Sequence, residues 1–188
     1  MADSTIENFA NTNIDVLIDS ETLQERITEL SQEITKDYQG QNFIMVCILR
    51  GGVVFLTDLM RQVSIPHLID FMAVSSYTDG ITKSEGRVRI TMDLLTDIEH
   101  INVLLVEDIV DTGHTLKQVL KLLNSRSPKS LRVCALLDKH VRREIDVKID
   151  YVGFQIPDKF VVGYGLDDEN GYWRNLPYIG VARPQQPF

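Results

Sequence analysis

The sequence of 188 residues is 44% hydrophobic and 24% charged, which suits one compact domain with a core and is short for two. Its 19 basic and 27 acidic residues give a net charge of −8, which disfavours extensive binding to nucleic acid or to an anionic membrane. No apolar run approaches the length of a membrane span, and the first residues lack the pattern of a signal peptide, so we expect a cytoplasmic protein.

Short apolar runs alternate with amphipathic stretches, the pattern of a single-domain α/β protein with a mainly parallel sheet. Strands are expected at residues 13–18, 43–49, 69–74, 88–92, 103–106, 131–137 and 151–156. Helices are expected from Ser20 or Thr22 to about Gln39, from residue 53 to about 61, and from 116 to the Ser127-Pro128 pair. Residues 75–86 contain few apolar side chains, so we predict a long loop or extended hairpin there that acts as a lid.

Residues 102–115 read N-V-L-L-V-E-D-I-V-D-T-G-H-T, an apolar strand followed by carboxylates and a small polar loop that opens a helix. Such loops line the crevice where open α/β sheets bind ligands. Glu107 and Asp108 can hold a vicinal diol or a metal ion. The alternative is an ordinary turn in which Asp111 or Thr112 caps the helix. The residues whose N–H groups and hydroxyls suit a phosphate at the helix N-terminus are Thr112, Gly113, His114 and Thr115.

A second glycine-containing loop, Arg50-Gly51-Gly52, also follows a strand and opens a helix. Its glycines allow backbone N–H groups to face an anion, and Arg50 adds positive charge. Taken alone, the loop could be a tight turn whose glycines only relieve crowding. Because both loops leave the same sheet, we predict that they bind one phosphorylated ligand together.

Three other side chains are singled out by their position in the predicted strands. Cys47 and Cys134 fall inside apolar runs without metal-ligand spacing, so both are expected to be buried free thiols. Lys139 follows the strand at residues 131–137, where a lysine can donate to a carbonyl oxygen of a ligand. Alternatively, Lys139 belongs to a solvated basic run over residues 139–148.

Two motifs resemble the type I phosphoribosyltransferases, and the resemblance covers residues 42–174. The stretch V-L-L-V-E-D-I-V-D-T-G-H-T resembles their motif for phosphoribosyl pyrophosphate (PRPP), and D-K-F-V-V-G-Y-G-L-D resembles the base-binding hood of the 6-oxopurine branch. The pair Ser76-Tyr77 resembles that of the flexible lid loop in this branch. The resemblance implies helices flanking the sheet over a core at about residues 40–156, and a small hood from about residues 1–20 and 157–188.

The resemblance also implies roles for individual residues. Asp111 would accept the proton from purine N7, and the peptide bond between Leu49 and Arg50 would be cis. The residues implied in PRPP binding are Leu49, Arg50, Gly51, Gly52, Glu107, Asp108, Thr112, Gly113, His114, Thr115 and Arg174. Those implied in purine binding are Lys139, Phe160, Val161 and Asp167. Those implied in binding Mg²⁺ are Glu107, Asp108 and Asp167. Without the resemblance, Phe160 would be assigned to the core.

From the resemblance we predict a magnesium-dependent purine-salvage enzyme that joins hypoxanthine, guanine or both to PRPP, giving IMP or GMP and pyrophosphate. Its partners would be these small molecules and further copies of itself, in a homodimer or homotetramer. One alternative is an RNA-binding regulator built on the same fold, favoured only by the basic run at residues 139–148 and nearby basic residues. Another is a related transferase that acts on xanthine or a pyrimidine. The sequence leaves the preference between the two purines open.

Overall fold

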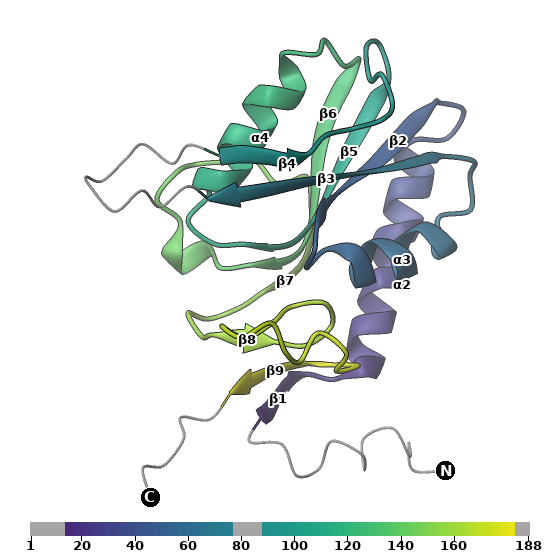
Figure 1. The fold of residues 1–188 in the computed structure, drawn as a ribbon. Coiled ribbons are helices and arrows are strands. Elements are labelled where there is room, and N and C mark those ends of the chain that lie inside the picture. The colour runs from purple at the N-terminus through teal and green to yellow at the C-terminus, as the bar shows by residue number, and fades with distance from the viewer. Residues whose placement is uncertain (1–13, 77–87, 183–188) are drawn as a thin grey trace, which may run out of the picture.

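A six-stranded sheet lies at the centre of the chain, where the continuous apolar runs predict it (Figure 1). In this computed structural model, which describes residues 14–76 and 88–182, the strand order is β4-β3-β2-β5-β6-β7. All neighbouring strands are parallel except β3 and β4. The strands are β2 (Phe43–Leu49), β3 (Leu68–Ser76), β4 (Val88–Met92), β5 (Asn102–Val110), β6 (Ser130–Asp138) and β7 (Tyr151–Gln155).

Helices cover both faces of this sheet, because successive residues of a strand point to opposite sides. On β2, Phe43, Met45 and Cys47 pack with helices α2 and α3, whereas Ile44 and Val46 pack with α4 on the other face. Figure 1 shows α2 and α3 together on one side and α4 on the other. The helices are α2 (Ser20–Asp37), α3 (Val53–Gln62) and α4 (His114–Asn124).

The two ends of the described chain meet in a second, antiparallel sheet of order β1-β9-β8, at the bottom of Figure 1. Its strands are β1 (Ile14–Ile18), β8 (Val161–Val162) and β9 (Ile179–Ala182). These strands belong to the predicted hood. The predicted fold class, a mainly parallel sheet flanked by helices with a small hood from the terminal segments, is therefore confirmed.

Some predicted boundaries are wrong, and local contacts explain why. Helix α2 is capped by Asp19, whose Oδ1 accepts from the N–H of Thr22 at 2.8 Å, and not by Ser20 or Thr22. Strand β5 continues to Val110 because its pairing with β6 continues that far, so Glu107 and Asp108 belong to the strand. A 3₁₀ helix, η1 (His140–Arg142), follows β6 without having been predicted.

Three further predictions concern the cysteines, the lid and membrane-spanning segments. Cys47 and Cys134 are free and buried, as predicted, and burial raises the pKa of both thiols. Tyr77 and the rest of the predicted lid up to residue 86 lie outside the described residues, whereas Ser76 is the last residue of β3. No helix in the described ranges has the length and apolar character needed to cross a membrane.

Candidate active site

The phosphate loop, which we define as Asp111–Thr115, joins β5 to α4 and borders a cavity of about 230 Å³. The residue that precedes α4 is Gly113, and no side chain caps the helix, so the proposed capping by Asp111 or Thr112 is wrong. The cap residue therefore leaves the first N–H groups of the helix without a side-chain acceptor. Gly113, which precedes the helix, has φ +90°, and a Cβ there would lie 2.7 Å from the carbonyl oxygen of Ile145. The loop therefore requires glycine at this position and presents a helix N-terminus suited to a phosphate.

Two carboxylates lie beside the phosphate loop at the end of β5. Burial raises the pKa of Glu107 well above its usual value, and the neighbouring charge of Asp108 raises it further. Burial also raises the pKa of Asp108 to about 6, although its Oδ1 accepts from the N–H of Ile109 at 2.7 Å. A cation or a pair of ligand hydroxyls would stabilise the ionised forms. These residues therefore suit either a metal ion or a ribose diol.

The glycine loop, Arg50–Gly52, lies directly against Asp108. A Cβ on Gly51 would lie 1.5 Å from Oδ2 of Asp108, so only glycine allows this approach. A Cβ on Gly52 would lie 2.9 Å from Sγ of Cys47. The peptide bond between Leu49 and Arg50 is cis, which confirms the expectation from the resemblance. The structure therefore brings the two predicted ligand loops into contact.

The hood contributes a third wall to the same site. Gly165 has φ +100°, and a Cβ there would lie 2.2 Å from the carbonyl oxygen of Gly51, so the hood touches the glycine loop. Arg174 donates to the carbonyl oxygen of Gly165 at 2.6 Å and forms an ion pair with Asp167. The charges of Arg174 and Asp167 in turn lower and raise the pKa of Asp108. Residues far apart in the sequence are thus held within electrostatic reach of one another.

A buried hydroxyl fastens the hood to the helices below it. The hydroxyl group of Tyr164 donates to Asp58 of α3. Gln24 of α2 donates to the same carboxylate at 2.8 Å and to the Tyr164 hydroxyl at 3.3 Å. Burial followed by the Asp58 contact raises the pKa of Tyr164, so the hydroxyl stays protonated as a donor. The sequence did not single out Tyr164, although it stands inside the hood motif.

The remaining candidates differ in their exposure. Lys139 at the end of β6 is only 6% exposed, and its ammonium group has no hydrogen bond or ion pair with any described residue. Phe160 is 56% exposed, so its assignment to the core is wrong and its ring is open to a ligand.

Asp111 lies beside Arg142. Nε of Arg142 lies 3.4 Å from Oδ1 of Asp111, and Nη1 of Arg142 lies 3.7 Å from Oδ1 of Asp158. This arginine was not predicted, because its sequence neighbours suggested only a solvated basic run.

Several charges of the predicted basic run and of its neighbours are paired with acidic residues. Arg143 forms a buried ion pair with Asp138, and Lys148 pairs with Asp150. Among the nearby basic residues proposed for RNA binding, Arg126 pairs with Asp93 at 2.8 Å and Arg132 pairs with Asp37 at 2.8 Å. Each of these charges is balanced by an acidic partner, which leaves little attraction for a polyanion.

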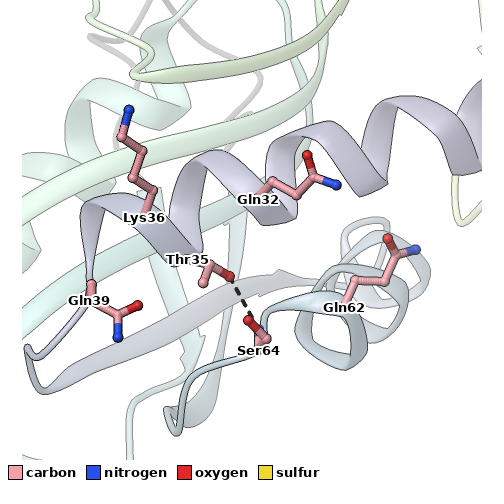
Figure 2. Close-up of a pocket in the computed structure, with 6 residues that line it drawn as sticks. All are labelled: Gln32, Thr35, Lys36, Gln39, Gln62 and Ser64. Carbon is pink, nitrogen blue, oxygen red and sulfur yellow. Dashed lines mark hydrogen bonds between the residues drawn. The ribbon is translucent and has the colours of Figure 1, made fainter.

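A second cavity, of about 440 Å³, lies on the outer side of α2 and near the end of α3 (Figure 2). Figure 2 shows the hydrogen bond that crosses it, from the N–H of Ser64 to Oγ1 of Thr35 at 3.2 Å. Gln39, in its wall, lies just before the start of β2, at the opposite end of that strand from the glycine loop. This cavity is therefore separate from the candidate active site.

The fold and the site define an α/β protein with two loops and a carboxylate pair at the carboxyl ends of its parallel strands, an arrangement suited to a phosphorylated, diol-bearing ligand. The phosphoribosyl transferase domain family matches residues 14–169 of the chain. The chain belongs to this family.

Individual relatives and solved structures are more specific than the family match. The chain is 50% identical over 171 residues to the hypoxanthine phosphoribosyltransferase of Haemophilus influenzae, covering 89% of this chain and 94% of that protein. It is 48% identical over 171 residues to a hypoxanthine-guanine phosphoribosyltransferase of Staphylococcus aureus, covering 91% and 94%. A crystal structure of a hypoxanthine phosphoribosyltransferase from Staphylococcus aureus superposes with a TM-score of 0.88 at 45% identity, covering 98% of each chain.

Proposed function

We propose that this protein is a purine-salvage enzyme that transfers the phosphoribosyl group of PRPP to hypoxanthine, guanine or both, giving IMP or GMP and pyrophosphate. The observation that carries the proposal is the position of Asp108, which lies between the glycine loop and the phosphate loop. An anionic carboxylate pair flanked by two anion-binding loops suits a ribose that bears phosphates on both sides. The relatives with these activities share about half of their residues with this chain.

The ribose subsite stabilises the charge that develops during the reaction. As the bond between ribose C1 and pyrophosphate breaks, positive charge grows on the ring. Glu107 and Asp108 accept hydrogen bonds from the ribose hydroxyls and place negative charge near that cation. The phosphate loop binds the 5′-phosphate, while the glycine loop and Arg174 bind the pyrophosphate.

The base subsite positions the purine and takes its proton. Asp111 accepts the proton from N7 as the new bond forms. Lys139, a buried donor without a protein partner, binds the exocyclic O6 and disfavours adenine, whose amino group would meet a donor with a donor. Phe160 stacks on the ring, and the backbone of Val161 binds its edge.

We propose Mg²⁺ as the cofactor, with one ion at Glu107 and Asp108 and a second at Asp167. The raised pKa values of the first two support this proposal, because a nearby cation would stabilise their ionised forms. In the described ranges no three His, Cys, Asp or Glu side chains group as a complete metal-ligand set. This arrangement suits Mg²⁺, which keeps several waters and takes further ligands from substrate oxygens. When bound, the ion would neutralise the leaving pyrophosphate.

A cytoplasmic location and assembly into a homodimer or homotetramer also stay predictions.

The test is turnover with PRPP and Mg²⁺ against hypoxanthine, guanine, xanthine, adenine and uracil, each supplied separately. We expect nucleotide from hypoxanthine, guanine or both, and the ratio of the two rates gives the preference. Product from none of the five bases would refute the proposal. Product from xanthine alone would favour the related transferase.

A second experiment tests the general base. Asp111→Asn should keep PRPP affinity and lose turnover by about 10²–10⁴-fold, because proton transfer is lost. Asp158→Asn is the matched control, since both carboxylates lie near Arg142 and only Asp111 is assigned to proton transfer. Near-normal turnover of Asp111→Asn would remove this residue from the role.

A further inference from the structure

We propose that the buried ion pair between Arg143 and Asp138 is a positioning element that holds the phosphate loop in its binding conformation. Neither residue is assigned to a ligand. The inference rests on the proposed function, because it takes the phosphate loop as the site of the PRPP 5′-phosphate.

The segment after β6 supports the phosphate loop through main-chain hydrogen bonds. The carbonyl oxygen of Thr112 accepts from the N–H groups of Glu144 at 3.0 Å and Ile145 at 3.1 Å. The carbonyl oxygen of Val110, just before the loop, accepts from the N–H of Lys139 at 2.9 Å. Because these bonds use carbonyl oxygens of the loop and its flank, they leave the loop N–H groups available to a phosphate.

Arg143 lies at the centre of this support. Its Nη2 forms the ion pair with Asp138 and also donates to the carbonyl oxygen of Val110 at 3.4 Å. A Cβ on Gly113 would lie 3.2 Å from its Cδ, so the arginine stem packs directly beneath the left-handed glycine. The guanidinium thus ties the loop to the end of β6, the strand that also delivers Lys139.

The ion pair is buried, so the loss of one partner would leave the other as an unpaired buried charge. The side chains of Arg143 and Asp138 are 10% and 7% exposed, and Nε of Arg143 is buried without a hydrogen-bond partner among the described residues. An arginine left without its carboxylate would be an uncompensated buried charge, so it would move toward water and release the loop. A glycine-containing loop loses more order than others when its support is removed.

Loss of the ion pair should weaken the binding of the phosphorylated substrate, PRPP, and not that of the base. A preorganised loop binds an anion without first being ordered, so loss of the support weakens PRPP binding. The residues proposed to hold the purine itself, Lys139, Phe160 and Val161, lie outside the loop, so the affinity for the base should stay unchanged. A merely structural ion pair would instead lower the stability of the fold and leave both Michaelis constants as they are.

The test uses the double variant Asp138→Leu/Arg143→Met in the full chain. Removing both charges avoids an unpaired buried charge, so this variant should fold where Asp138→Leu or Arg143→Met alone fails to. We expect its KM for PRPP to rise about tenfold or more, with the KM for hypoxanthine unchanged. Hydrogen exchange of the amides in residues 111–115 should become faster. The matched control is Asp93→Leu/Arg126→Met, which removes an ion pair outside the site and should change neither KM.

The outcomes separate this inference from the proposed function. Turnover by the wild-type chain with an unchanged KM for PRPP in the Asp138→Leu/Arg143→Met variant would overturn the positioning role alone. A wild-type chain that binds PRPP in a calorimetric titration without turnover would overturn the proposed function alone, provided that the variant binds PRPP more weakly. A wild-type chain that binds no PRPP would overturn both.

Discussion

Asp108→Asn should make the ligand-free protein more stable at neutral and alkaline pH. In the folded protein the pKa of Asp108 is raised from 3.8 to about 6, chiefly by burial. The difference of about 2 pKa units corresponds to roughly 3 kcal/mol, at 1.36 kcal/mol per unit. Asparagine has the same shape and can still accept from the N–H of Ile109, but it carries no charge to desolvate.

The sign follows from proton binding in the two states. Between about pH 4 and pH 6 the folded protein holds the Asp108 proton more tightly than the unfolded chain does. The free energy of unfolding therefore falls as the pH rises through this window, and the deficit persists above it. The variant lacks this loss, so its advantage should approach 3 kcal/mol at pH 8 and vanish below about pH 4.

Urea unfolding of the wild-type chain and the variant at pH 4 and pH 8, without PRPP or Mg²⁺, measures this difference. Asp70→Asn is a control of opposite sign. Burial raises the pKa of Asp70, but hydrogen bonds from the N–H groups of Thr96, Phe71 and Leu95 outweigh burial and lower it. Asp70→Asn should therefore be less stable than the wild-type chain at pH 8. Equal stability of Asp108→Asn and the wild-type chain at pH 8 would refute the reasoning.

Three further variants test the walls of the site. Gly51→Ala places a methyl group 1.5 Å from a carboxylate oxygen, so turnover should fall by about a hundredfold. Gly40→Ala strains a backbone at φ +71° but has open space around it, at the opposite end of β2 from the glycine loop, so it should keep normal turnover. Equal rates of the two variants would contradict this reasoning. Tyr164→Phe removes the hydroxyl that fastens the hood to α3, so the KM for the purine should rise several-fold. An unaltered purine KM would count against the fastening role. Lys139→Gln should weaken discrimination against adenine by about tenfold in kcat/KM, and unchanged selectivity would leave Lys139 without a role in base choice.

The sequence alone determined the features that depend on local patterns. An apolar strand, a small polar loop and an amphipathic helix follow one another from Asn102 to Asn124. The spacing of the apolar residues predicts this order, because it changes from a continuous run to a helical stripe. The two glycine-containing loops were predicted at the ends of β2 and β5 for the same reason. The residues in these loops indicated a site for a phosphate and a diol, and the family was indicated by the resemblance of the loop motif to that of the type I phosphoribosyltransferases.

Contacts between distant segments were decided only by the tertiary structure. The approach of Gly165 to Gly51, the packing of Arg143 beneath Gly113 and the sheet formed by the two chain ends join residues whose separation has no periodic signature. The end of β5 depends on how far β6 continues beside it, which no local pattern of either strand contains. The direction of a side chain also depends on tertiary packing. The sequence placed Arg143 in a basic run, but in the structure its side chain points inward and pairs with Asp138. A buried charge is stable only where a partner lies within reach.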